Sequence, residues 1–282
     1  MSSDQAKTLR DLRQQADARR RTDQVETPST RVIAITSGKG GVGKTASAAH
    51  VAFYAHEAGQ RVLVIDLDTG DLSKTLAEYQ VGAVASSLFT EEGIGSLAAK
   101  QGDNSGCLTM LPADKLLANL VFVSLEKAQQ NFKANLARFA DDFDLCVVDT
   151  APGLGIAKAA ALHVADAVLS PVEMEAYSIE GIKSTMVTVL NARKSNPKLS
   201  FLGILPSRVD TRSPRQKSNL DQVRQAHGAL MAPLVIALRS SIAEALAHGI
   251  PVWKLRKTSA RAAGKEMREL GDYVLAKLGV NQ

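Results

Sequence analysis

Short apolar runs rich in β-branched residues alternate along the chain with longer stretches whose apolar residues recur at helical spacing. Nearly continuous apolar runs of this length are typical of strands buried on both faces of a sheet. The pattern predicts an α/β fold, a mostly parallel twisted sheet with helices on both faces. The expected strands are residues 31–36, 61–66, 107–111, 145–149, 167–172, 201–205 and 234–238, and the expected helices include residues 44–57, 125–140, 179–193, 214–227 and 260–278.

The start of the chain departs from this pattern. It mixes acidic and basic side chains and offers only Leu9, Leu12 and a few alanines as apolar anchors, which bury too little surface to fix a structure. We expect a mobile charged tail over residues 1–30, more simply a solvated tail than a binding arm, followed by one domain over residues 31–282.

Composition narrows the class of protein. With 282 residues, 45% of them hydrophobic and 22% charged, the chain has the balance of a soluble globular protein. No apolar run approaches the roughly 20 residues that span a bilayer, so we expect a cytoplasmic protein. Cys107 and Cys146 stand alone in apolar surroundings, which favours buried thiols over a disulfide or a sulfur-ligated metal. A net charge of +5 is compatible with an anionic partner.

Residues 37–47 read SGKGGVGKTAS and lie between an expected strand and an expected helix. Gly38, Gly43, Lys44 and Thr45 satisfy G-x-x-x-x-G-K-[ST], the pattern of a phosphate-binding loop. The glycines let backbone N–H groups converge on phosphate oxygens, and the helix start adds unpaired donors and a positive dipole end. We expect Lys44 to neutralise the β- and γ-phosphates and the Thr45 hydroxyl to bind Mg²⁺.

Three aspartates end apolar runs. Asp66 and Asp68 end VLVIDLD, and Asp149 ends LCVVD. Because ligands bind at the carboxyl edge of an open parallel sheet, all three side chains are expected to face one Mg-nucleotide. An aspartate at a strand end is otherwise a turn former or a helix cap. That alternative stays more open for Asp66 than for Asp149.

Residues 39–45, KGGVGKT, resemble the deviant Walker A signature K-G-G-x-G-K-[ST] of the ParA/MinD group of P-loop ATPases. The resemblance extends through VLVIDLDTGD, VVDTAPGLG, SPVEMEAYSIEGI and SSIAEALAHGIPVWKL, so it covers nearly everything after residue 30. Together these stretches look closest to the IncC-type ParA proteins of plasmid partition. The resemblance implies a P-loop NTPase fold of the SIMIBI type, with ATP and Mg²⁺ as cofactors.

The resemblance also implies roles for single residues. Lys39 would cross the interface of an ATP-dependent homodimer to the partner subunit's phosphates, and with Lys44 and Asp68 it would form the catalytic set. Asp68 would orient the attacking water, Asp149 would hold Mg²⁺ through a water, and Asp66 would support the metal's surroundings. The implied nucleotide-binding residues are Gly38, Lys39, Gly40, Gly41, Val42, Gly43, Lys44, Thr45 and Ala46.

Two stretches depart from the family pattern. Many members have a second hydroxyl residue after the Mg-binding threonine, whereas this chain has Ala46, so a side-chain contact to the α-phosphate is lost. Where many members read I-P-R-N, residues 236–239 read IALR, and the usual adenine-side contact is not carried over. The preference for ATP over GTP therefore rests on the family as a whole and on the lack of an N-K-x-D guanine motif in the sequence.

Members of the group differ in the surface on which the ATP dimer sits. Met267, Leu270, Val274 and Leu278 recur at helical spacing near the C-terminus, but the acidic residues among them favour packing on the domain over membrane insertion. The resemblance implies that the ATP dimer binds non-specific DNA and is therefore associated with the nucleoid. It also implies that a ParB-type centromere-binding partner stimulates ATP hydrolysis. The DNA-binding candidates are Arg208, Arg212, Arg215, Lys217, Arg239, Lys254, Arg256, Lys257, Arg261 and Lys265.

The sequence thus predicts a ParA-type plasmid partition ATPase that hydrolyses ATP slowly, dimerises on ATP and binds non-specific DNA as a dimer. Two alternatives remain: a MinD-like membrane-associated positioning ATPase, and a non-hydrolysing ATP-binding scaffold. Iron–sulfur relatives of the fold are disfavoured because the two cysteines form no CxxC pair.

Overall fold

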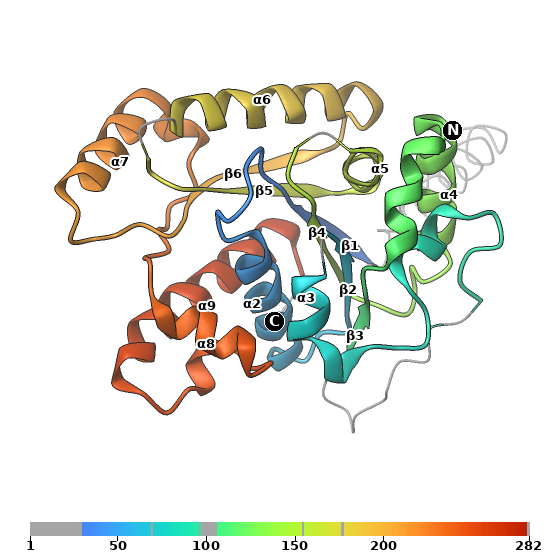
Figure 1. Ribbon diagram of the computed structural model, residues 1–282, viewed down its shortest axis with the longest axis horizontal. Helices are drawn as coiled ribbons and strands as arrows, with labels where there is room; N and C mark the ends of the chain where they lie inside the picture. Colours follow the sequence, from blue (N-terminus) through green and yellow to red (C-terminus); the bar gives the residue numbers. More distant parts are fainter. Residues whose placement is uncertain are drawn as a thin grey trace, which may run out of the picture.

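The computed structural model of the chain describes residues 30–280 apart from residues 69, 96, 98–105, 154, 176 and 177, so the expected tail lies outside the described residues except for Thr30. Six parallel strands form one sheet in the order β3-β2-β4-β1-β5-β6 (Figure 1). This confirms the predicted fold class. The strands are β1 Arg31–Ile35, β2 Val62–Leu67, β3 Leu108–Leu111, β4 Leu145–Thr150, β5 Ala167–Val172 and β6 Ser200–Pro206.

Helices cover both faces of the sheet (Figure 1). On one face α2, α8 and α9 pack together, and on the other α4, α5 and α6 do so, while α7 lies beyond β6. The helices are α2 Lys44–Glu57, α3 Asp71–Thr75, α4 Leu125–Ala137, α5 Ile156–Val164, α6 Ser178–Ser195, α7 Pro214–His227, α8 Ser240–Ala247 and α9 Thr258–Leu278. Short 3₁₀ helices are η1 Ala77–Tyr79, η2 Ala85–Phe89, η3 Lys115–Phe122, η4 Gly228–Leu230 and η5 Val252–Lys254.

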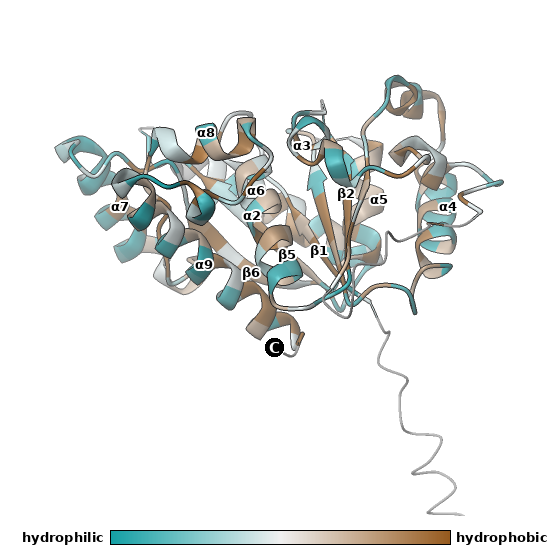
Figure 2. Cartoon of the chain, turned by 90° about the horizontal axis from the view of Figure 1, so that it is seen from below, coloured by the Kyte–Doolittle hydropathy of each residue, from teal (hydrophilic) through white to brown (hydrophobic). Residues whose placement is uncertain are grey.

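Alternation along the strands divides the interior into two cores. In β1, Ile33 and Ile35 belong to the core beneath α2 and α9, whereas Val32 and Ala34 belong to the core beneath α4 and α5. Successive side chains of a strand point to opposite faces, so a strand buried on both faces must be apolar throughout. The brown strands and the teal α7 in Figure 2 show the resulting division between interior and surface.

Helix α9 packs against α2. Its predicted apolar stripe, Met267, Leu270, Val274 and Leu278, is buried in the same core as α2, and a Cβ added at Gly271 would meet the Tyr54 ring at 2.3 Å. The close approach therefore needs glycine at that position. The prediction that this helix docks on its own domain is confirmed. Among the described residues, no helix is both long and apolar enough to cross a membrane.

One predicted strand is wrong. Residues 234–238 form no ladder and contribute only an isolated bridge between Ala237 and Val209. Ala232 and Ile236, four residues apart, donate to the β6 carbonyls of Ile204 and Pro206, which are only two residues apart, so the segment does not keep the regular register of a ladder. The other six strands agree with the prediction to within a residue or two, and the predicted buried thiols, Cys107 and Cys146, are both buried and free.

Candidate nucleotide-binding site

The glycine-rich loop connects β1 in the middle of the sheet to α2. Gly41 and Gly43 have φ angles of 75° and 93°, which lie in the left-handed region that favours glycine. The Gly43 carbonyl accepts the Ser47 N–H at 3.0 Å and so begins the helix. A Cβ at Gly43 would also lie 2.6 Å from Ser207 Oγ. The predicted strand, loop and helix are therefore present in the order that a phosphate-binding loop requires.

Lys44, the first residue of α2, is buried with 5% of its side chain exposed, and its Nζ lies 3.5 Å from Asp68 Oδ2. Asp68 follows directly after β2 and is also largely buried. Two residues that are far apart in the sequence thus meet at the carboxyl edge of the sheet. Burying an unpaired lysine charge is costly, and here Asp68 supplies an opposite charge.

Thr45 and Asp149 form the next contact along this edge, where the Thr45 hydroxyl donates to Asp149 Oδ2 at 2.7 Å. Asp149 is fully buried in β4, and its Oδ1 has no hydrogen-bond partner among the described residues. Burial raises the pKa of Asp149 to about 7, against the opposing effect of the Thr45 hydrogen bond. A hydroxyl beside a carboxylate with a free oxygen is an oxygen donor set that suits Mg²⁺.

Asp66 uses both carboxylate oxygens within the protein. Oδ1 accepts the Asp68 N–H at 3.0 Å, and Oδ2 accepts the Ser73 N–H and hydroxyl at 2.9 and 2.6 Å. In the sheet register Asp66 lies opposite Asp149. The observed contacts make Asp66 the residue that fixes the Asp68 backbone and the start of α3.

Lys44, Thr45 and Asp68 line a cavity of about 360 Å³ at the carboxyl edge. Arg208 is part of its wall, although the sequence grouped this residue with the DNA candidates. It has a φ angle of 53°, rare for arginine, and its Nε donates to Glu173 Oε1 at 2.7 Å. The cavity is lined by Gly40, Gly41, Gly43, Lys44, Thr45, Asp68, Asp71, Pro152 and Arg208.

A smaller cavity of about 100 Å³ adjoins the same glycine loop. Ala46 and Ser207 line it together with residues 236–239, the stretch that departs from the family pattern. Glu266 of α9 holds this stretch, accepting the Ala237 N–H at 3.0 Å and an Arg239 N–H at 2.7 Å. The DNA candidate Arg239 is thereby turned toward α9.

Lys39 stands at the rim of the loop with 71% of its side chain exposed. Its Nζ lies 3.8 Å from Glu173 Oε2, so Glu173 faces both Lys39 and Arg208. An exposed ion pair at this distance contributes little free energy. Lys39 is therefore free to leave this contact and reach an anion elsewhere.

Sequence reasoning missed Lys158 of α5. Lys158 is buried, with 4% of the residue exposed. Its amine donates to the Ser37 carbonyl at 3.0 Å and to the Gly153 carbonyl at 2.7 Å. Burial, and secondarily the charge of Lys44, lowers the pKa of Lys158 to about 8. The available signal was a single lysine within the otherwise apolar helical stretch IAKAAALHV.

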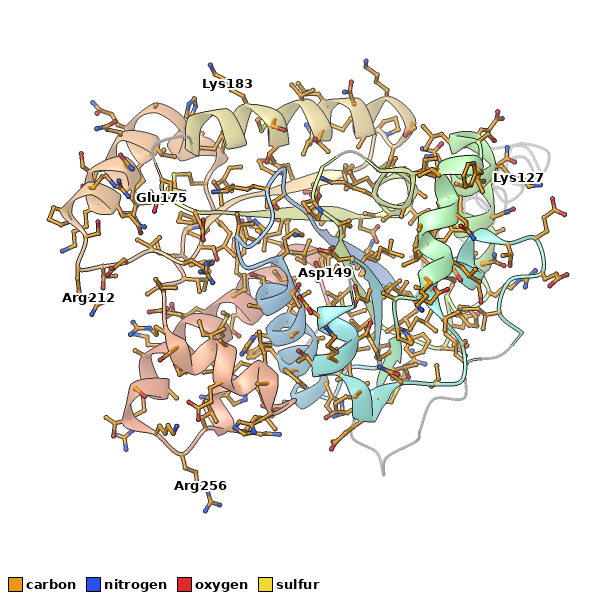
Figure 3. The ribbon with its side chains drawn as sticks, in the orientation of Figure 1. Lys127, Asp149, Glu175, Lys183, Arg212 and Arg256 are labelled. Atoms are coloured by element: carbon orange, nitrogen blue, oxygen red, sulfur yellow. The ribbon has the colours of Figure 1, made fainter. Side chains whose placement is uncertain are left out.

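The DNA candidates do not form one patch. Arg212, before α7, and Arg256, before α9, lie on well-separated parts of the molecule (Figure 3). Most candidates pair with carboxylates, among them Arg215 with Glu175 at 2.8 Å. The other paired candidates are Arg208, Arg212, Arg239, Lys254, Lys257 and Lys265. Within the part of the chain that the structure describes, those without an ion pair are Lys217, Arg256 and Arg261, all exposed.

A glycine loop joining a central strand to a helix, with a buried lysine and strand-end aspartates around it, defines the class of P-loop nucleotide-binding proteins. A family model described as an AAA domain matches residues 30–201. Protein IncC of Escherichia coli is 45% identical over 265 residues, which cover 93% of this chain and 74% of that protein. The chain therefore belongs to the IncC family of ParA-type P-loop ATPases.

Two further comparisons agree with this assignment. The chromosome-partitioning ATPase Soj of Thermus thermophilus is 31% identical over 88% of this chain and 96% of its own length. The solved structure of cobyrinic acid a,c-diamide synthase from Mycobacterium smegmatis, with a bound ATP analogue and magnesium, has a TM-score of 0.68 at 25% identity. It covers 90% of this chain and 97% of that chain.

Proposed function

We propose that this protein is a Mg²⁺-dependent ATPase of plasmid partition. ATP binding joins two copies, the dimer binds non-specific DNA, and a ParB-type centromere-binding partner stimulates slow hydrolysis. The observation that carries the proposal is that Lys44, Asp68 and Thr45 line the phosphate-loop cavity, with Asp149 buried behind Thr45 and bonded to it. Membership of the IncC family supports the partition role, and the ATP analogue and magnesium bound by a protein of the same fold support the cofactors.

In this proposal the loop residues 38–46 bind the phosphates through their N–H groups, and Lys44 turns from Asp68 to the β- and γ-phosphates. Thr45 would hold Mg²⁺ directly and Asp149 would hold it through a water, while Asp66 keeps the adjacent loop in place. Bound there, the metal would supply positive charge beside the phosphates. Asp68, released from Lys44, accepts a hydrogen bond from the attacking water and orients it.

Dimerisation is assigned to Lys39. Its long side chain is exposed beside the cavity and weakly held by Glu173, and a lysine is suited to act as a mobile point charge. In the proposed dimer, Lys39 of each subunit reaches the partner subunit's phosphates. The strength of pairing then reports whether the site holds ATP or ADP.

DNA binding is assigned first to the candidates without an ion pair, which are Lys217, Arg256 and Arg261. Cations already bound to carboxylates contribute less to counterion release than free ones. Pairing two subunits doubles the number of such cations on one particle, which favours DNA binding by the dimer. The corresponding location is the cytoplasm, in association with the nucleoid.

The MinD-like alternative needs an apolar helix face for the membrane, but the apolar stripe of α9 is buried against α2. The proposal assigns the orientation of the attacking water to Asp68, which lies beside Lys44 in the phosphate-loop cavity, whereas a non-hydrolysing scaffold would leave this carboxylate without a catalytic role. Both observations favour the partition ATPase.

The experiment that tests the proposal compares the unaltered protein with Asp68→Ala in Mg²⁺, ATP and DNA. The variant is expected to bind ATP and DNA but to release phosphate about 100-fold more slowly, because a positioned proton acceptor contributes that much or more. Asp221→Ala, an exposed carboxylate of α7, is the control. Normal phosphate release by Asp68→Ala would exclude its role, and absence of ATP binding by the unaltered protein would exclude the function.

A further inference from the structure

Lys158 forms hydrogen bonds to two loops of the nucleotide site. It is the third residue of α5, and its amine donates to Ser37, where the glycine loop begins, and to Gly153, in the loop that follows β4. The same β4 carries Asp149. A single buried amine thus sets the spacing between the phosphate loop and the segment that continues from the aspartate at the metal position.

Two carbonyl oxygens, and no carboxylate of the described residues, surround the charge of Lys158. No carboxylate lies within ion-pair distance of its amine among the described residues, and the charge that acts on it is the like charge of Lys44. Two carbonyl oxygens satisfy hydrogen bonds of the amine but cancel only part of its charge, so burial is costly. The arrangement is complementary to an anion bound in the adjacent phosphate loop.

The side chain of Lys158 also has a packing role from which its charge must be separated. Its stem lines a cavity of about 320 Å³ between α4, α5 and α6, together with apolar residues such as Leu125 and Leu162. An apolar stem in this position stabilises the contact between the three helices. An unbranched apolar residue would preserve that contact and lose the amine.

We propose that Lys158 is a positioning residue of the nucleotide site, which ties the phosphate loop to the loop after β4 and whose charge is balanced by the bound triphosphate. The inference rests on the proposed function, since it takes the anion to be nucleotide phosphate. The two loops are then held in register most firmly when the site is occupied. ATP, with one more phosphate than ADP, is held better by this charge.

The test uses the full chain with Lys158→Met, which keeps the stem, and Lys158→Arg, which keeps the charge. Lys183→Met is the matched control, because Lys183 projects outward from α6 (Figure 3). The readouts are the dissociation constants for Mg-ATP and Mg-ADP, the Tm without nucleotide, and hydrogen exchange in residues 150–155 with and without ATP.

Lys158→Met is expected to weaken Mg-ATP binding about tenfold and Mg-ADP binding by less, since a buried positive charge bonded to the start of the phosphate loop is lost. Its Tm without nucleotide should equal or exceed that of the unaltered protein, because an uncompensated buried charge is removed. ATP should no longer protect residues 150–155. Lys158→Arg should recover ATP binding at least in part, and Lys183→Met should behave as the unaltered protein.

Two results would overturn the inference while leaving the proposed function intact. One is normal ATP affinity and ATP-dependent protection in Lys158→Met. The other is an equal loss of ATP and ADP binding that follows a lowered Tm, which is the result of a purely structural role. If the unaltered protein bound no ATP, the proposed function and the inference would both fail.

Discussion

The carboxyl edge of the sheet and the basic surface near the C-terminus both collect positive charge, but they hold it differently. At the edge, Lys44 and Lys158 are buried. Lys44 has Asp68 beside it at 3.5 Å, whereas Lys158 has two carbonyl oxygens as partners and, among the described residues, no carboxylate. On the surface, Lys254 and Lys257 are exposed and paired with Glu57 and Glu244. The charge of Lys158 is therefore left for a ligand to balance, whereas the charges of these two surface lysines are already balanced by carboxylates.

This difference separates the positive charges that indicate a ligand from those that do not. A buried cation without a full set of counterions is costly, so its presence indicates a ligand of opposite charge. An exposed cation with a carboxylate beside it has little cost and indicates little. A count of basic residues therefore overstates the charge available on the proposed DNA surface, and a count of the charges within the phosphate-loop motif leaves out Lys158.

The largest effect is expected from Lys44→Ala. Removing this buried charge should weaken Mg-ATP binding about 1000-fold, in the range found when one partner of a buried charged contact is truncated. Equilibrium titration with a fluorescent ATP analogue measures it. A loss smaller than that of Lys158→Met would reverse the order of the two lysines and break the comparison.

A buried basic group that stays neutral sharpens the comparison. His50 of α2 accepts the Val252 N–H at Nε2 and bonds the Ala46 carbonyl through Nδ1, and burial lowers its pKa to about 4. Neutral His50 is favoured in the folded protein, so its contribution to the free energy of unfolding is fully present above pH 6.5. This contribution is lost as the pH falls from 6.5 toward 4, because the unfolded protein takes up the proton first. The pKa difference corresponds to about 3 kcal/mol.

Urea unfolding at several pH values between 7 and 4, compared with His50→Gln, measures this contribution. Glutamine keeps a donor and an acceptor but does not titrate, so the difference between the two proteins should shrink as the pH falls. A constant difference would show that the pKa of His50 is the same in the folded and the unfolded protein.

The smallest effect is expected at the surface. Arg256→Ala with Arg261→Ala should weaken binding of the ATP-bound protein to DNA about tenfold and lower the salt slope by about 2 for each subunit, since two phosphate contacts are lost. Lys115→Ala with Lys133→Ala removes two exposed charges, which have no ion pair within the described part of the chain, from η3 and α4. These elements pack on the opposite face of the sheet from α9. Equal effects of the two pairs would show that net charge alone acts.

Repeating spacing and motif order made much of the fold and the phosphate loop predictable. Helices α2 and α7 begin and end at the predicted residues, and α7 follows a Ser213 cap and Pro214, both legible in the sequence. The strand-end aspartates were found because β2 and β4 are unbroken apolar runs.

Contacts between distant segments were not predictable in the same way. The strand expected at 234–238 fails because pairing depends on neighbours as well as on composition, and the segment loses its register with β6 between Ala232 and Ile236. Lys158 belongs to no motif, and its importance comes from the carbonyl groups that the fold places around it. The pairing of Arg239 with Glu266 likewise joins residues of different elements.

In the proposed function, Lys39 makes dimerisation depend on whether ATP or ADP is bound. Light scattering after size-exclusion chromatography, with Mg²⁺ and either a non-hydrolysable ATP analogue or ADP, tests it most directly. The unaltered protein should be a dimer with the analogue and a monomer with ADP, and Lys39→Ala should bind the analogue yet remain a monomer. A stable dimer in Lys39→Ala, or equal dimer in ADP, would contradict the account.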